Sequence, residues 1–403
     1  MGFRLSLLIL FFLALGLLLR SVLRRGGKAS LSGGYVVLGH LAALLIGLML
    51  SPAFLSVIDQ TTKSGLIPIL EMAFGWVGFL FGFQFNISTL RRVSSPYLAR
   101  AVLESLIAFL IIFSVSFVLL IHILTGINLN EALKIALALG AVLSISSPTL
   151  VGVMNKKIRA KSPVVDFLSV VTSIDGLTGL AALGLINISW HPAGLKWFVS
   201  CLLILILGIG QAFLIWLLLR TERKAVPTTI LGIGVLTLGA GMSAYLGLAP
   251  VVPGALAGMI AANLAPGLRQ RLARMLVTAE SGLYFGLVVL AGVFLPWRFG
   301  DFPALAVVLI CSMGVILRFV GKSAGAGIIY RMSRLPADKK TAHQFCCSVQ
   351  SGGALILVAA LCYNQTIAGK NAPIVLLTAL AGFIFGEIIS IVCLPRLLHS
   401  LKR

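Results

Sequence analysis

The chain has 403 residues, 59% of them hydrophobic and 11% charged, and its mean hydropathy is +1.08. Apolar stretches long enough to cross a bilayer recur from end to end, so the composition excludes a water-soluble globular protein and predicts a polytopic membrane protein. The net charge of +21 is spread over many short connections instead of one face, which argues against nucleic-acid binding and for contact with anionic lipid.

Breaks at polar residues, glycine and proline divide the apolar sequence into about thirteen helical spans, which we assign to a single all-α membrane domain over residues 1–403. In chain order the spans fall near residues 3–19, 33–53, 64–86, 99–121, 131–155, 163–188, 195–219, 227–245, 248–264, 279–297, 302–326, 341–363 and 372–395. No stretch is left over for a water-soluble domain.

The basic residues alternate between the connections in the way expected for such a count. Most of the 32 Lys and Arg residues fall in every second connection, whereas Arg318 and Lys322 fall within a span. Short cytoplasmic loops carry an excess of Lys and Arg. The pattern therefore predicts an N-terminus outside and a C-terminus inside.

One carboxylate interrupts the sixth span. The segment "SVVTSIDGLTGL" (169–180) places Asp175 near the predicted bilayer midplane. On insertion scales an Asp at this depth costs about 2.5–3.5 kcal/mol, so residues of this kind usually serve a function. The alternative is a polar contact with a neighbouring Ser or Thr that locks two helices together.

Two other spans carry helix-breaking residues. Pro148 lies deep in the fifth span, where it removes a backbone donor and frees a carbonyl, and Gly352 and Gly353 weaken the twelfth span. Both breaks are surrounded by side-chain oxygens. These oxygens belong to Ser144, Ser146, Ser147 and Thr149 at the first break and to Ser348, Gln350 and Ser351 at the second.

The positions of the breaks indicate internal symmetry. Five spans over about 33–188 and five over about 248–395, with linking helices over about 195–245, form two halves of opposite orientation, and each break lies in the fourth span of its half. A matched pair of interrupted helices in inverted repeats is typical of a transporter site at the bilayer midplane. We therefore expect Asp175 and the two breaks to converge.

The sequence gives little support for a metal centre, an enzyme active site or a channel filter. The six cysteines and five histidines are scattered without the spacing of metal ligands, so no metal centre is expected. No set of nucleophile, base and orienting group stands out, and no cofactor motif is recognised, so we expect neither an enzyme nor a bound cofactor. The absence of a repeated filter sequence disfavours a channel.

Five segments, in order, resemble those of bacterial monovalent cation:proton antiporters, which are sodium/proton and potassium/proton exchangers. The segments are "EMAFGWVGFLFGFQFNISTLRR" (71–92), "SISSPTLVGVMNKK" (144–157), "TSIDGLTGL" (172–180), "YLGLAPVVPGALAGMIAANLAP" (245–266) and "CCSVQSGGALILV" (346–358). The resemblance covers nearly the whole chain.

The resemblance implies a homodimer in a bacterial or archaeal cytoplasmic membrane, with a scaffold and a moving transport domain made of spans 4, 5, 6, 11, 12 and 13. It places Asp175 at the ion site, with Ser146, Ser147, Thr149 and Gln350 as further ligands, and Arg318 as a possible charge partner near the crossing. Alternatively, Arg318 extends its guanidinium to the cytoplasmic surface. We expect the other intramembrane acids to be structural or interfacial. These are Glu71, Glu104 and Glu387.

The chain departs from the antiporters at two acidic positions, which are occupied by Ile174 and Gln84. With one strongly titratable group, a proton and a monovalent cation would exclude each other at Asp175. We therefore expect electroneutral exchange of a proton for Na⁺, with K⁺ or Li⁺ as other possible substrates. Two alternatives stay open: a symporter for an organic anion on a similar scaffold, and a membrane sensor that transports nothing.

Overall fold

The computed structural model describes residues 32–52, 57–87, 95–123, 127–147, 163–190, 196–221, 225–264, 266–295, 304–331, 352–367 and 371–400. Within these residues the chain is helical and contains no strand. Its thirteen described helices are α2 (Ser32–Leu50), α3 (Gln60–Gly65), α4 (Ile67–Gly82), α6 (Ser95–Ile123), α7 (Leu129–Ser144), α9 (Pro163–Ser189), α10 (Trp197–Thr221), α11 (Ala225–Tyr245), α12 (Val251–Ala262), α13 (Pro266–Phe294), α14 (Ala304–Arg331), α16 (Gly353–Thr366) and α17 (Pro373–Ser400).

The predicted fold class, an all-α polytopic membrane protein, is confirmed. Every predicted span from the second to the thirteenth contains a described helix, with α3 and α4 together covering the third. Six spans of described residues are long and apolar enough to cross a membrane, and five shorter apolar helices accompany them. Apolar runs become helices because backbone groups in lipid must be satisfied within the segment. The predicted first span, 3–19, lies outside the described residues.

The largest boundary error concerns α13, which begins at Pro266, well before the predicted start at 279. The basic segment that precedes the apolar run was assigned to a connection, but it is helical. Proline suits the first position of a helix, where its missing N–H leaves no bond unmade. Arg271, in the same segment, donates from Nη1 to the carbonyl of Leu219 at the end of α10 over 2.9 Å.

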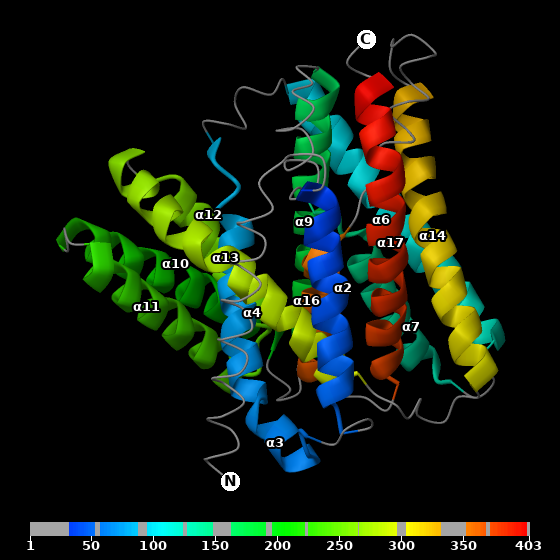
Figure 1. Cartoon of the computed structure of the whole chain (residues 1–403), viewed down its shortest axis with the longest axis horizontal. Helices are drawn as coiled ribbons and strands as arrows, with labels where there is room; N and C mark the ends of the chain where they lie inside the picture. The colour runs from blue at the N-terminus through cyan, green and yellow to red at the C-terminus, as the bar shows by residue number, and fades with distance from the viewer. Residues whose placement is uncertain are drawn as a thin grey trace.

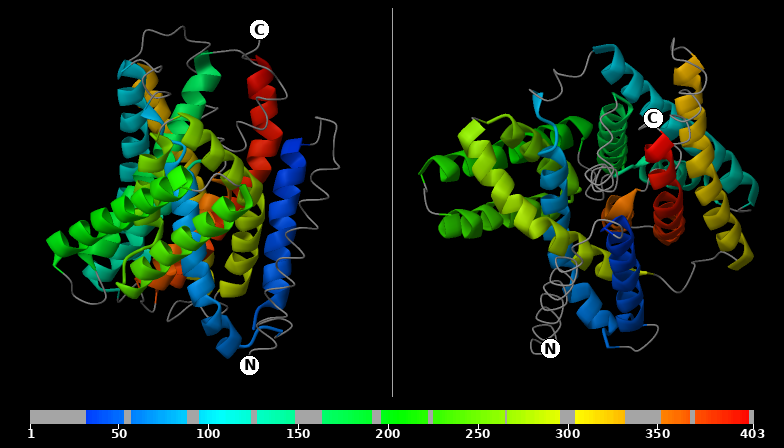
Figure 2. Two further views of the ribbon diagram at one scale, coloured as in Figure 1. Left: turned by 90° about the vertical axis from the view of Figure 1, so that its left-hand side faces the viewer. Right: turned by 45° about the horizontal axis from the view of Figure 1, so that its top comes forward.

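The helices pack in two groups (Figures 1 and 2). Helices α6, α7, α9, α14, α16 and α17 contact one another and form the six-helix group, whereas α4, α10, α11 and α12 form the four-helix group. Helices α2 and α13 pack together; α13 contacts members of both groups, and α2 contacts α17 of the six-helix group. The six-helix group consists of the spans that the resemblance assigns to the transport domain, and the movement of that domain stays a prediction.

Glycines allow α4 and α12 of the four-helix group to touch through their backbones. A Cβ atom on Gly78 would lie 2.1 Å from the carbonyl oxygen of Val251, and one on Gly258 would lie 2.1 Å from that of Phe79. Small residues at such positions let membrane helices approach closely, where van der Waals packing holds them. This group is therefore held by apolar surfaces of high complementarity.

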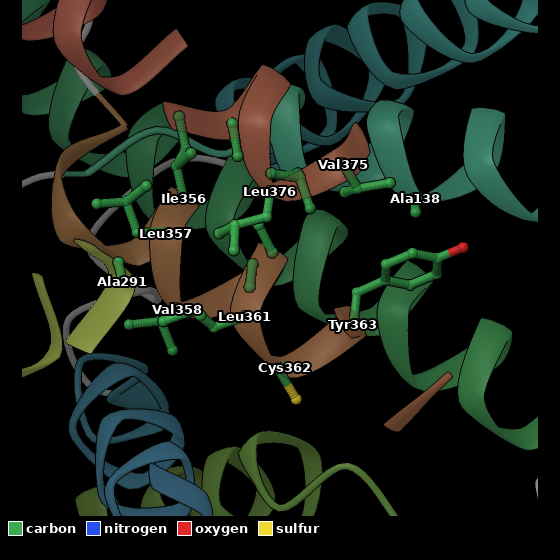
Figure 3. Packing of buried hydrophobic residues seen from close by; sticks show 14 of the residues in the cluster. Ala138, Ala291, Ile356, Leu357, Val358, Leu361, Cys362, Tyr363, Val375 and Leu376 are labelled. Atoms are coloured by element: carbon green, nitrogen blue, oxygen red, sulfur yellow. The ribbon is translucent and has the colours of Figure 1, made fainter. Parts of the chain in front are cut away.

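Helix α16 lies at the centre of the molecule. Its residues from Gly353 to Tyr363 are all buried. Figure 3 shows its side chains among Ala138, Ala291 and Leu376, which come from α7, α13 and α17. A helix that is apolar on every side must be surrounded by protein or lipid. Its burial holds the start of α16 at a fixed place inside the six-helix group.

Candidate functional site

Helix α7 ends inside the protein. Its last helical residue is Ser144, and Ile145 leaves the helical conformation with φ −59° and ψ 131°. The side chains of Ser144, Ile145 and Ser146 are fully buried. The carbonyls of the last turn of a helix have no partner within the helix, so other groups must satisfy them here.

The start of α16 meets this end of α7. Gly353 has φ +55°, a left-handed conformation that favours glycine. A Cβ atom on Gly353 would lie 2.9 Å from Cβ of Ser147, and one on Gly352 would lie 3.0 Å from the carbonyl oxygen of Ile145. The predicted convergence of the two breaks is therefore seen for these two helix ends. Pro148, Thr149 and Gln350 lie outside the described residues, so their predicted roles stay predictions.

Helix α9 lies against both ends through two glycines. A Cβ atom on Gly179 would lie 2.6 Å from the carbonyl oxygen of Ala141, and one on Gly176 would lie 3.3 Å from Cδ2 of Leu355 in α16. Asp175 directly precedes Gly176 and is only 3% exposed. The carboxylate that the sequence singled out thus lies inside the six-helix group, on the helix that packs against the two ends.

The direct charge partner of Asp175 is Lys322 on α14. Lys322 Nζ lies 2.6 Å from Oδ2 of Asp175, and the two side chains are 3% and 4% exposed. The same ammonium donates to Oγ of Ser146 over 2.5 Å. The sequence reasoning missed Lys322 and treated Asp175 as the single titratable group of the site. That premise is wrong, because a second titratable side chain, Lys322, donates a hydrogen bond to the carboxylate.

Arg318 lies at the end of α7, close to the start of α16, and interacts electrostatically with Asp175. Its guanidinium is fully buried, so the alternative in which it reaches the cytoplasmic surface is wrong. Nη1 donates to the carbonyl of Ile145 over 2.8 Å and also to that of Leu143. Arg318 therefore satisfies carbonyls at the end of α7 and supports the segment that carries Ser146. Five donors on a rigid plane suit an arginine to this task.

Two buried acids flank these bases. Glu104 on α6 and Glu387 on α17 are 3% and 2% exposed, which fits the structural half of the expectation that they are structural or interfacial. Glu104 acts electrostatically on Lys322, and Glu387 on Arg318. Among the described residues, these four and Asp175 are the only buried side chains with formal charge, and all five lie on the six-helix group. Glu71, by contrast, is half-buried on α4.

One sequence signal could have found Lys322. Arg318 and Lys322 are four residues apart in an apolar span, a spacing that places both on one face of a helix. Two intramembrane bases on one face indicate acids opposite them, since such charges pair within the protein.

The arrangement suits a site for one small cation. The Asp175 carboxylate and the Ser146 hydroxyl converge on the Lys322 ammonium, and both are oxygen ligands of the type that monovalent ions accept. A site for a tightly bound transition metal is not indicated, because no group of three His, Cys, Asp or Glu side chains in the described part of the chain could hold one.

Comparison with known proteins identifies the fold. No protein-family model and no curated protein sequence matches this chain. Among solved structures, the sodium proton antiporter MjNhaP1 from Methanocaldococcus jannaschii at pH 8 is similar, with a TM-score of 0.72 and 12% identity over 99% of each chain. An electron-microscopy structure of the same antiporter gives a TM-score of 0.58 and 15% identity over 97% of this chain and 95% of that one. The two chains therefore share a fold over their whole length.

Proposed function

We propose that this protein is a secondary active antiporter that exchanges a monovalent cation for a proton across a membrane. The observation that carries the proposal is the ion pair between Lys322 and Asp175, buried where the end of α7 meets the start of α16. Desolvation costs several kcal/mol per buried ion, so a buried pair is weak evidence of a purely stabilising role. Charged residues inside membranes mark ion pathways and proton relays. The shared fold with a sodium proton antiporter supports this interpretation.

The exchange follows from competition for one carboxylate. In the described arrangement Asp175 accepts from the ammonium of Lys322, which occupies the place that a cation would take. A cation entering this place displaces the side chain of Lys322, which releases its proton to become a neutral amine, and Ser146 can turn its hydroxyl oxygen from Lys322 to the cation. A proton that returns to Lys322 restores the ammonium, and the original pairing forms again as the cation departs. If the six-helix group crosses only in these two occupied states, the cation and proton gradients are coupled by alternating access.

Charge counting supports exchange of one proton for one cation. The five buried side chains comprise three acids and two bases, so with all of them ionised the group carries one net negative charge. This is the proton-loaded state, and its net charge stays the same when a monovalent cation takes the place of the proton that Lys322 releases. The six-helix group then has the same charge in both half-cycles, and exchange is electroneutral. The hydrocarbon side chain of Ile174 does not enter this count, and the premise of a single titratable group at the site is wrong.

We assign Na⁺ as the main substrate because the similar solved structures are described as those of a sodium proton antiporter. The oxygen ligands also suit K⁺ and Li⁺. The proposal includes a homodimer in a bacterial or archaeal cytoplasmic membrane, with the C-terminus inside, which the alternation of basic connections favours. It retains the two inverted repeats, each with one broken helix, that the sequence predicts.

The test is proton movement in proteoliposomes that contain the purified protein and a pH-sensitive dye. We expect Na⁺ added outside to drive protons out of acidified vesicles, with K⁺ and Li⁺ measured in the same way. Protein-free vesicles are the control. A symporter would move protons only when an organic anion is added, and a sensor would move none with any cation; either result would exclude the proposal.

A further inference from the structure

A long apolar groove lies between α6 and α9, which run side by side in the six-helix group. Its volume is about 720 Å³, and the residues that line it are hydrophobic apart from Thr178 and Ser189. Along α9 the lining extends from Ile174 to Trp190, which corresponds to roughly 24 Å of helix. Because Ile174 adjoins Asp175, near the predicted bilayer midplane, the groove extends along α9 from that level to one surface, which is at least one leaflet of a hydrocarbon core of about 30 Å.

The groove opens on the exposed surface of α6 and α9. Leu106 on α6 and Leu185 on α9 line it and are 41% and 54% exposed, and Ala181 and Ser189 lie exposed one turn to either side of Leu185. Apolar cavities stay dry, because water finds no polar partners in them. In a bilayer, a groove of this composition and orientation is filled by hydrocarbon chains.

A polar pocket lies beyond one end of the groove, where α7 begins. Its volume is about 250 Å³, and its lining includes Asn128, Asn130, Glu131 and Lys134. Oε1 of Glu131 accepts from Asn371 over 2.6 Å, which fixes the position of the carboxylate. The pocket thus presents one cationic and one anionic side chain, separated by one helical turn or less.

Trp190 joins the groove to the polar pocket. It lines the groove, its Nε1 donates to Oδ1 of Asn130 over 3.0 Å, and Lys134 Nζ lies 5.6 Å from its ring centroid. Leu137, three residues after Lys134 on the same face of α7, lines the groove as well. Tryptophan with one polar edge is typical of the level of the lipid headgroups. The apolar groove and the charged pocket are therefore neighbours, connected by the contacts of Trp190, and together they are named the groove-and-pocket surface.

We propose that this surface binds one phospholipid with a zwitterionic amine headgroup. An acyl chain lies in the groove along α9, the phosphate lies at Lys134, and the amine faces Glu131. The chemistry of the surface favours this ligand, because a single-chain hydrocarbon would leave the charged pocket empty and a soluble anion would leave the groove empty. Lysine binds phosphate as a point charge.

The site lies beside the candidate ion site without sharing a residue with it. Ile174 lines the groove and is the chain neighbour of Asp175. Phe85, at the end of α4, lines the same groove and follows a helix of the four-helix group. A bound acyl chain would thus contact both groups of helices. Lipid binding is independent of the proposed antiport and can be measured without it.

The experiment uses the whole protein in proteoliposomes that contain a phosphatidylethanolamine with a photoactivatable diazirine in its acyl chain. After illumination, adducts are mapped by mass spectrometry. We expect labelling of the segment 174–190 to saturate as the lipid fraction rises. Ala181→Trp, which fills the groove, should lower this labelling at least ~10-fold, whereas Ile209→Trp on the lipid-exposed face of α10 should leave it unchanged.

A second variant tests the charged end and does not alter the groove. Lys134→Gln should weaken saturable labelling by the phospholipid about fivefold, the effect expected for one basic residue at a membrane surface. Labelling by a photoactivatable alkane without a phosphate should not change in Lys134→Gln. Labelling that rises linearly with lipid and is insensitive to Ala181→Trp would overturn the site. Saturable labelling by a fatty acid that Lys134→Gln leaves unaltered would overturn the phospholipid as its ligand.

Discussion

The two helix groups solve the problem of packing inside a membrane in different ways. In the four-helix group, α4 and α12 touch backbone to backbone through Gly78 and Gly258. In the six-helix group, the described structure holds five buried side chains with formal charge, and Lys322 contacts Asp175 while Arg318 contacts the freed carbonyls at the end of α7. Apolar contacts at this density have one best arrangement, whereas a charge network can exchange one ion for another. Under the proposed function, the first group is expected to serve as the scaffold and the second to carry the exchanged ion.

The largest effect is expected when the carboxylate of Asp175 in the six-helix group is removed. Asp175→Asn retains the shape of the side chain but abolishes its charge, so we expect a folded protein with no cation-driven proton movement. The measurement is the dye assay in proteoliposomes, with circular dichroism and size-exclusion chromatography as checks on folding. Glu71→Gln, on the half-buried α4 position, is the matched control and should retain exchange. Exchange at the wild-type rate in Asp175→Asn would remove Asp175 from the site.

The energetic coupling between Lys322 and Asp175 can be measured separately from the effect of each side chain alone. Lys322→Met leaves Asp175 buried without its direct ammonium partner, and removal of one partner of a buried pair typically destabilises a protein by about 3–5 kcal/mol. We expect a clearly lower apparent melting temperature in detergent. The double variant Lys322→Met with Asp175→Asn should recover much of this loss, because no charge of the pair remains. Equal and additive losses would show that the two side chains are not coupled.

The four-helix group offers the opposite test, in which stability changes and ion chemistry does not. A Cβ atom on Gly78 would clash with the backbone of α12, so Gly78→Ala should force α4 and α12 apart and cost about 1–3 kcal/mol. Gly210→Ala on α10, where a Cβ atom meets nothing within 4 Å, is the control. At permissive temperature we expect the apparent KM for Na⁺ to be unchanged in both. A raised KM in Gly78→Ala would mean that the four-helix group shapes the site.

A smaller effect is expected where α16 begins. Gly353→Ala places a Cβ atom at φ +55° and against Ser147, with a strain of about 1–2 kcal/mol. The strain should displace the start of α16 from the end of α7 and raise the apparent KM for the cation several-fold. Gly234→Ala on α11, which has open space around it, should have no such effect. The measurement is the Na⁺ dependence of the initial exchange rate in both variants, and an unchanged KM in Gly353→Ala would contradict the prediction.

The last prediction is that the membrane potential has no effect on the exchange rate. If the six-helix group carries the same net charge with a proton bound as with a cation bound, an imposed membrane potential should not change the exchange rate. Movement of one uncompensated charge through 100 mV would contribute about 2.3 kcal/mol, which is large enough to detect. The measurement sets the potential with valinomycin and K⁺ and uses Na⁺ as the transported ion. Acceleration or reversal by the potential would contradict the charge count, and Glu104 and Glu387 would be the first residues to replace.

The sequence by itself determined the helices and the position of the key acid. Apolar runs become helices in lipid for a local reason, because each segment must satisfy its own backbone, so twelve spans could be predicted within a few residues at most ends. Asp175 stood out because a lone carboxylate in such a run is expensive. The start of α13 at Pro266 was not predicted, because the basic, amphipathic segment that precedes residue 279 lacks the high hydropathy of a membrane span.

The tertiary structure alone decided which charges meet. Nothing local in the sequence distinguishes Lys322 from Arg318 as the partner of Asp175, because the choice depends on the rotation of α14 and on its depth against α7 and α9. The same packing directs Arg318 to the carbonyls of Leu143 and Ile145 and buries Glu104 and Glu387 beside the two bases. Helix formation is set by neighbours in the chain, whereas ion pairing is set by distances of a few ångströms between segments far apart in it.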